Sequence, residues 1–133
     1  MGSLTISNVT KTFGSTEVLK GINIDIADGE FLILVGPSGC GKSTLMNTIA
    51  GLEEVTTGQL LLAGEDVTER SPKDRDIAMV FQSYALYPTM NVARNISFGL
   101  DTRGVPKQER DQRVQEVSTL LQINHLLDRK PSQ

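Results

Sequence analysis

Residues 31–51 read FLILVGPSGCGKSTLMNTIAG, an apolar run followed by a glycine-rich turn and then by a helical pattern. Within this stretch Gly36, Gly41, Lys42 and Ser43 have the spacing G-x-x-x-x-G-K-[ST]. The apolar residues 31–35 do not alternate with polar ones, which predicts a strand buried on both faces of a parallel sheet. We therefore expect a strand that ends in a phosphate-binding turn at the carboxyl edge of a sheet.

The residues of this turn suit a di- or triphosphate. Gly36, Gly39 and Gly41 permit positive φ and keep side chains away from a ligand, so backbone N–H groups can converge on phosphate oxygens. The following helix adds the positive end of its dipole, and Lys42 adds a full charge near the β- and γ-phosphates. Ser43 can bind Mg²⁺. The candidate binding residues are Gly36, Pro37, Ser38, Gly39, Cys40, Gly41, Lys42, Ser43 and Thr44.

Composition narrows the classes of protein. The chain has 133 residues and is 38% hydrophobic, enough for one domain with a core. A net charge of −3 with no Trp gives no basic footprint, so we expect no nucleic-acid partner. The apolar runs are too short to span a membrane and no signal-peptide pattern opens the chain, which predicts a cytosolic protein. A single Cys excludes an internal disulfide.

The rest of the chain alternates strand and helix patterns. We expect antiparallel strands over 4–13 and 22–26, a helix over 43–50 ended by Gly51, and a strand over 58–63. A second unalternating apolar run at 77–81 predicts another buried strand. Asn91 can cap a helix running to about Leu100, and Pro106 opens a further helix. The apolar stripe of that last helix is Val114, Val117, Leu120 and Leu121.

Several residues admit two interpretations. Phe13, before a Gly-Ser-Thr turn, is either an apolar plug at the sheet edge or a platform on which a base stacks. Glu65 and Asp66 resemble a metal-binding acidic strand end, but they follow a glycine, which favours a turn. Cys40, between two glycines at the helix start, is either a reactive thiol or a small residue that the loop tolerates. His125 has no Cys or His neighbour, which favours a cap or surface role over metal binding.

Gln82 and the segment after it follow the second apolar run. If that strand is parallel to the first, Gln82 lies at the same sheet edge as the phosphate loop and can reach a metal or a water. Residues 83–90, from Ser83 to Met90, read SYALYPTM, an apolar loop interrupted by proline. This loop is either a partner surface or a segment packed within the chain.

Taken together, these motifs resemble the ATP-binding subunits of ABC transporters. GPSGCGKSTL from Gly36, VFQSYALYPTMNVARNISFGL from Val80 and HLLDRKP from His125 are similar to the ATPase subunits of carbohydrate importers of the maltose and glycerol-3-phosphate type. The resemblance covers nearly the whole chain. It implies an α/β fold, the P-loop NTPase fold of the ABC ATPase type, with residues 1–133 as the N-terminal part of one ATP-binding domain. That part would hold an antiparallel β region, the phosphate-loop strand and helix, and the start of the helical subdomain.

The resemblance also implies roles, cofactors and partners. ATP and Mg²⁺ are the implied cofactors, with Phe13 stacking on adenine and Lys42 binding the phosphates. Ser43 would bind the metal, and Gln82 would sense the metal and the attacking water. Residues 83–90 would receive a cytoplasmic helix of a transmembrane importer subunit, which places the protein in the cytoplasm, peripherally on the inner face of the cell membrane. The implied activity is ATP hydrolysis that powers uptake of a sugar or sugar-phosphate.

One departure from the family pattern limits that activity. A signature resembling LSGGQ, an acidic strand end (Walker B) with a catalytic glutamate and a switch histidine do not occur in these 133 residues. In the family, two ATPase subunits complete each other's sites, so we expect this chain to hydrolyse little ATP alone. A central strand would also be missing beside residues 31–35, which predicts self-association or domain swapping. The alternative is a non-enzymatic nucleotide-binding or interaction fragment with a rearranged or swapped fold.

Overall fold

The computed structural model describes residues 2–83 and 85–133, and the chain divides into two compact units, Met1–Met79 and Val80–Gln133. The first unit is built on an antiparallel sheet with the strand order β2-β1-β3-β4. Its strands are β1 (Leu4–Phe13), β2 (Thr16–Ile26), β3 (Thr57–Leu62) and β4 (Glu65–Asp66). The predicted antiparallel strands near the N-terminus are confirmed, and so is the strand over 58–63.

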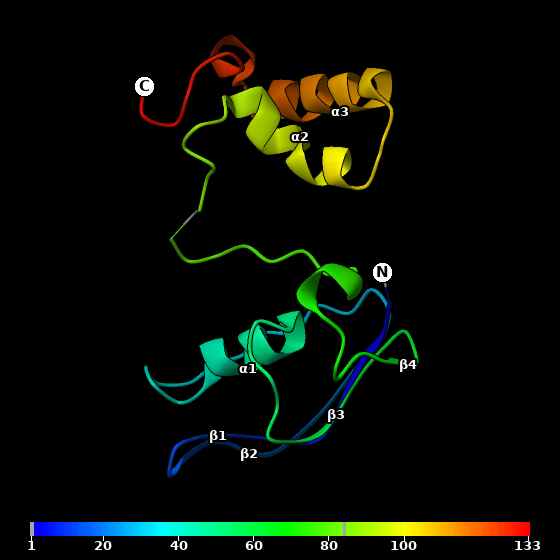
Figure 1. The fold of residues 1–133 in the computed structure, drawn as a ribbon, viewed down its shortest axis with the longest axis vertical. Helices are drawn as coiled ribbons and strands as arrows, with labels where there is room; N and C mark the ends of the chain where they lie inside the picture. The colour runs from blue at the N-terminus through cyan, green and yellow to red at the C-terminus, as the bar shows by residue number, and fades with distance from the viewer. Residues whose placement is uncertain (1, 84) are drawn as a thin grey trace. The chain divides into compact units, whose positions relative to one another are not determined.

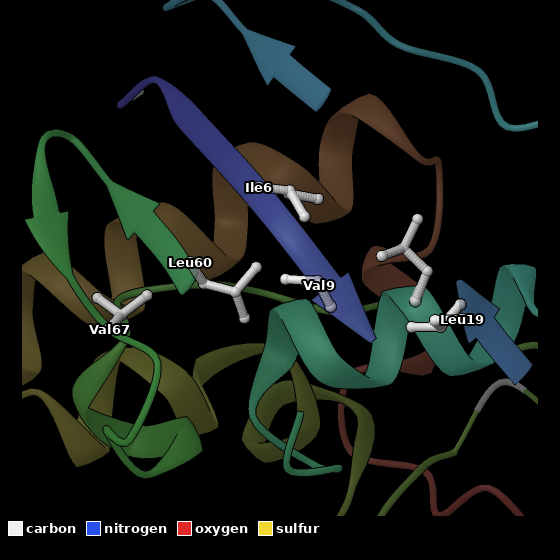
Figure 2. Close-up of a cluster of buried hydrophobic side chains, with 6 residues drawn as sticks. Ile6, Val9, Leu19, Leu60 and Val67 are labelled. Carbon is white, nitrogen blue, oxygen red and sulfur yellow. The ribbon is translucent and has the colours of Figure 1, made fainter. Parts of the chain in front are cut away.

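Helix α1 (Lys42–Ala50) lies against one face of this sheet (Figure 1). It ends as predicted at Gly51, which has a φ of 78° and donates its N–H to the last turn. The 3₁₀ turn η1 (Pro72–Asp74) follows later in the chain. Figure 2 shows the core between these elements, where side chains from the sheet point toward one another. Its buried members are Ile6, Val9, Leu19, Leu45, Leu60 and Val67.

A bulge in β1 fixes the register of this sheet. Asn8 has a φ of 47° and exchanges side-chain and backbone hydrogen bonds with Asn23 on β2. Gly58 on β3 passes so close to the bulge that a Cβ added there would lie 2.5 Å from the Asn8 carbonyl oxygen. Its φ of 97° also requires glycine.

The predicted strands over 31–35 and 77–81 are wrong, because neither run forms a strand in the structure. A strand is held by hydrogen bonds to a neighbouring strand, and the only described strands form the antiparallel sheet, which contains neither run. Apolar side chains therefore stay exposed: Phe31 is 86% exposed, Val35 is 90% exposed and Val80 is 86% exposed. The apolar sequence pattern was real, but the burial that it predicts depends on a partner strand.

The second unit packs α2 (Val92–Thr102) beside α3 (Lys107–Leu120), followed by the 3₁₀ turn η2 (Asn124–Leu126) (Figure 1). Asn91 caps α2 as predicted, since its side-chain oxygen accepts the N–H of Arg94 at 2.9 Å. Two further N–H groups of the first turn donate to the carbonyls of Arg129 and Leu127. The start of α2 is thus held by the end of the chain.

The predicted apolar stripe of α3 is only partly right. Val114 is buried, but Leu120 and Leu121 are exposed. The inward face is centred on Val114 and Ser118, which lie four positions apart. Ser118 is fully buried, and its hydroxyl is satisfied there by a hydrogen bond to the Val114 carbonyl. Leu120 lies about 200° around the helix from Ser118, and the helix ends before Leu121. None of the described helices combines the length and the apolar character needed to cross a membrane.

Candidate functional site

The glycine-rich turn forms a loop that its own lysine closes. The ammonium of Lys42 donates to the carbonyl oxygens of Gly36 at 2.6 Å and Pro37 at 2.8 Å, and lies 3.4 Å from the sulfur of Cys40. The first residue of α1 is therefore tied back to the start of the loop. This arrangement concentrates a full positive charge at the loop, next to a helix N-terminus.

The glycines of this loop are required for three different reasons. Gly41 has a φ of 95°, and an added Cβ would lie 3.1 Å from the Leu19 side chain and 3.2 Å from the Val18 carbonyl. Gly39 has a φ of 82° with open space around it, so only its backbone conformation needs glycine. An added Cβ at Gly36 would lie 2.7 Å from the sulfur of Cys40. A side chain at any of these three positions would thus meet either a steric contact or an unfavourable backbone conformation.

The start of α1 offers unpaired donors. Gly41 occupies its N-cap position with no side-chain cap, and the first helical hydrogen bond runs from the Leu45 N–H to the Gly41 carbonyl. The N–H groups of the first turn have no acceptor within the helix. Ser43 and Thr44 are the second and third residues of α1, so both side chains lie at the same helix end as these donors. Ser43 is exposed and Thr44 is half-buried. The predicted loop residues are thus brought together in one place.

Phe13 lies at the end of the β1–β2 hairpin against which the loop packs. It pairs with Thr16, and Gly41 contacts Val18, two residues further along β2 and therefore about 7 Å away along the strand. Phe13 is 44% exposed, too open for a plug that fills the sheet edge. Of the two interpretations of Phe13, the exposure favours a platform.

Sequence reasoning missed the partner of Phe13. The ammonium of Lys11 lies 4.8 Å from the centroid of the Phe13 ring, within range of a cation–π interaction. Positions two apart on a strand share a face, and this spacing was the available signal. The same ammonium bonds the Glu54 carbonyl at 2.6 Å and the Glu53 carboxylate at 3.1 Å.

Glu65 and Asp66 form the short strand β4, which directly follows the turn at Ala63 and Gly64. Asp66 pairs with Leu61 on β3 and accepts hydrogen bonds from Thr68 and Gln59. The Thr68 hydroxyl, then Gln59 and the Thr68 N–H, lower the pKa of Asp66 from 3.8 to about 2. These contacts satisfy the carboxylate within the hairpin, which favours the structural interpretation.

Two other predicted residues belong to the second unit. Gln82 is an exposed turn residue of the second unit. His125 is exposed in η2, consistent with a surface role. In the predicted partner loop, Leu86 and Tyr87 are exposed, whereas Tyr84 lies outside the described residues.

Comparisons with known proteins agree with the loop geometry. A family model described as ABC transporter matches residues 19–133. The maltose/maltodextrin import ATP-binding protein MalK of Yersinia pestis bv. Antiqua (strain Antiqua) is 55% identical over 131 residues, covering 98% of this chain and 36% of the relative. The sn-glycerol-3-phosphate import ATP-binding protein UgpC of Rhodopseudomonas palustris (strain BisB18) is 53% identical over 134 residues, covering 100% of this chain and 37% of the relative.

A solved structure shares the fold. The chain superposes on the dimeric ATP-binding cassette MJ0796, solved in a post-hydrolysis state bound to ADP and Pi, with a TM-score of 0.85 and 28% identity. The match covers 98% of this chain and 62% of that one. The chain spans little more than a third, 36%, of the length of the curated MalK relative. The fold class predicted from the sequence is confirmed, and the chain belongs to the ABC transporter family.

Proposed function

We propose that this chain is part of the ATP-binding domain of a sugar or sugar-phosphate importer, and that it binds MgATP at residues 36–44. The observation that carries the proposal is the loop closed by Lys42 beside the uncapped start of α1. Both compact units belong to that one domain in this proposal. The names of the relatives, which describe maltose and glycerol-3-phosphate import, support the class of solute.

Each residue of the site has a defined task in this proposal. The N–H groups of the loop and of the first turn of α1 bind phosphate oxygens, and Lys42 exchanges its loop carbonyls for the β- and γ-phosphates. Ser43 binds Mg²⁺, and Phe13 stacks on adenine. Gln82 approaches the metal and the attacking water.

The residues of the proposed site fit a Mg²⁺ ion whose ligands come mainly from the nucleotide and from water. The described residues contain no group of three or more His, Cys, Asp or Glu that could hold a metal ion. Mg²⁺ usually takes one or two protein oxygens in nucleotide sites and keeps several waters, so a single hydroxyl such as that of Ser43 suffices. The metal supplies charge neutralisation between the phosphates.

We propose that hydrolysis needs more than this chain. The loop residues stabilise charge on the phosphates, but the described site holds no carboxylate that could orient a water. A second ATPase subunit would complete the site, a proposal supported by the dimeric state of the MJ0796 structure. The transmembrane subunit would bind residues 83–90, which places the protein on the inner face of the cell membrane.

One observation favours a second candidate, a self-associating fragment with a rearranged or swapped fold. An apolar groove of about 530 Å³ lies between the sheet and α1, and the exposed run that begins at Phe31 forms part of its wall. Its apolar lining includes Leu4, Ile6, Ile24, Ile26, Phe31, Leu32, Leu34, Leu45, Met46 and Ile49. A second copy could cover this groove with the same apolar run. Light scattering that shows a monomer at high concentration would contradict it.

Calorimetry tests the nucleotide site. The unchanged chain should bind MgATP with measurable heat, and Lys42→Ala should abolish that heat because it removes the charge at the loop. Lys20→Ala removes the same charge from an exposed position on β2 and should leave binding unchanged. Equal affinities of the Lys42→Ala variant and the unchanged chain would refute the site.

A further inference from the structure

Lys11 contacts the Phe13 ring and is itself anchored by two further contacts. Its ammonium lies over the ring, donates to the Glu54 carbonyl at 2.6 Å, and pairs with the Glu53 carboxylate at 3.1 Å. The Lys11 side chain is only 12% exposed, whereas Phe13 is 44% exposed. A long, flexible side chain that would usually extend into water is instead immobilised behind an open aromatic ring.

The anchor of Lys11 belongs to the same structural element as the phosphate loop. Glu53 and Glu54 follow Gly51, where α1 ends, and the phosphate loop precedes Lys42, where α1 begins. The helix is nine residues long, about 14 Å. Lys11 therefore connects the far end of this helix to the ring, while Gly41 contacts the hairpin at the near end. The ring and the loop are fixed to the same rigid body from both ends.

A cation over one face of an aromatic ring leaves only the opposite face for stacking. The ring of Phe13 ends β1 beside a two-residue turn, where a side chain has few neighbours of its own. Without Lys11 the ring could adopt other rotamers, and binding a base would have to select one of them at an entropic cost. With Lys11 over one face, the ring already presents its opposite face before a base binds.

We propose that Lys11 is a positioning residue for the nucleobase: it fixes Phe13 so that the free face of the ring stacks on the base of a nucleotide whose phosphates occupy residues 36–44. This inference rests on the proposed function. It deepens that function by separating two contributions to affinity, one from the phosphate loop and one from the Lys11–Phe13 pair. The affinity for a ligand with phosphates but no base should therefore not depend on Lys11.

Measuring the affinities of the 133-residue chain for two ligands tests whether these two contributions are separate. MgATP carries base and phosphates, whereas magnesium tripolyphosphate carries phosphates alone. Lys11→Met keeps an apolar stem but removes the charge, and should weaken MgATP about three- to tenfold while leaving tripolyphosphate affinity unchanged. Lys11→Arg keeps a cation over the ring and should retain most of the MgATP affinity. Lys20→Met, on the neighbouring strand, controls for the loss of one positive charge.

Phe13→Leu, alone and combined with Lys11→Met, completes a double-mutant cycle. It should weaken MgATP alone, and adding Lys11→Met to it should cause no further loss, because Lys11 acts through the ring. An NMR measurement on the unchanged chain does not depend on any variant folding well: the Lys11 ε-methylene protons should be shifted upfield by the ring. Phe13→Leu should remove that shift.

Each outcome decides between the claims. Equal weakening of MgATP and tripolyphosphate by Lys11→Met would show that Lys11 acts on the loop or on the fold, and would overturn the inference. Unchanged MgATP affinity in that variant, or an absent upfield shift, would also overturn it. If the unchanged chain binds neither ligand, the proposed function fails and the inference fails with it. If the chain binds both, only the Lys11 assignment is under test.

Discussion

Asn95 binds both backbone groups of Tyr87. Its side-chain oxygen accepts the Tyr87 N–H at 2.8 Å, and its amide nitrogen donates to the Tyr87 carbonyl at 3.1 Å. The same nitrogen also lies within hydrogen-bond distance of the carbonyls of Met90 and Asn91. One side chain on α2 thus holds the second half of the proposed partner loop, while the Tyr87 ring packs 4.5 Å from Phe98.

Replacing Asn95 should release this loop. Asn95→Ala leaves the Tyr87 backbone groups without their partners, and we expect a loss of about 2 kcal/mol in the stability of the second unit, with faster amide exchange at Tyr87. Asn124→Ala is the matched control, because the side-chain amide of Asn124 donates to the side chains of Gln115 and Thr119 and not to the loop backbone. It should cost less than about 0.5 kcal/mol. Unchanged exchange at Tyr87 in Asn95→Ala would contradict this role.

Gly58 should tolerate no side chain. Gly58→Ala places a Cβ 2.5 Å from the Asn8 carbonyl oxygen at a φ of 97°, so we expect a loss of about 3 kcal/mol or more in urea unfolding. Gly64→Ala also adds a Cβ at positive φ, 81°, but nothing lies within 4 Å. That variant should cost only about 1 kcal/mol. Similar losses for the two variants would show that the contact with the bulge does not matter.

Asp66 should titrate well below an ordinary carboxyl. Its pKa is about 2 in the folded chain against 3.8 ordinarily, so its contribution to stability is complete above pH 3.8 and is lost as the pH falls toward 2. Carboxyl-carbon NMR should give a midpoint near 2. Thr68→Val should raise that midpoint more than Gln59→Met, because the Thr68 hydroxyl is the largest cause of the shift. A midpoint near 3.8 in the unchanged chain would refute these hydrogen bonds.

Arg75 should contribute strongly to stability through hydrogen bonds to backbone carbonyls. Its guanidinium donates to the carbonyls of Thr48, Ile49, Thr68 and Arg70, and the residue is 3% exposed. Arg75→Met removes these donors from buried acceptors and should cost about 3 kcal/mol in chemical unfolding. Arg70→Met removes an exposed ion pair with Glu65 and a weaker charge interaction with Asp66, and should cost less than about 1 kcal/mol. Equal losses would contradict the role of Arg75.

The sequence predicted those features that depend on local chemistry. The glycines and Lys42 specify a closed loop before α1, Asn91 specifies a helix start, and the alternating isoleucines specify β2. These signals are complete within a few residues, so they do not depend on distant partners.

Features that depend on a distant partner could not be predicted in the same way. The apolar runs at 31–35 and 77–81 indicated strands, but a strand forms only where another strand offers its backbone. Lys11, Arg75 and Asn95 looked like ordinary polar residues, because the backbone acceptors to which they donate lie up to 43 positions away. Nothing in their immediate sequence identifies those acceptors.

Arg75 also determines how the first unit can open. Its guanidinium joins the last turn of α1 to residues 68–70, and Gly51 leaves the space that the guanidinium fills, since an added Cβ would lie 2.7 Å from its Nε. The two segments cannot move apart unless Arg75 loses its hydrogen bonds to one of them. The end of α1 and the chain from Thr68 to Arg75 therefore form one cooperative unit, whose amides should exchange with a single opening free energy.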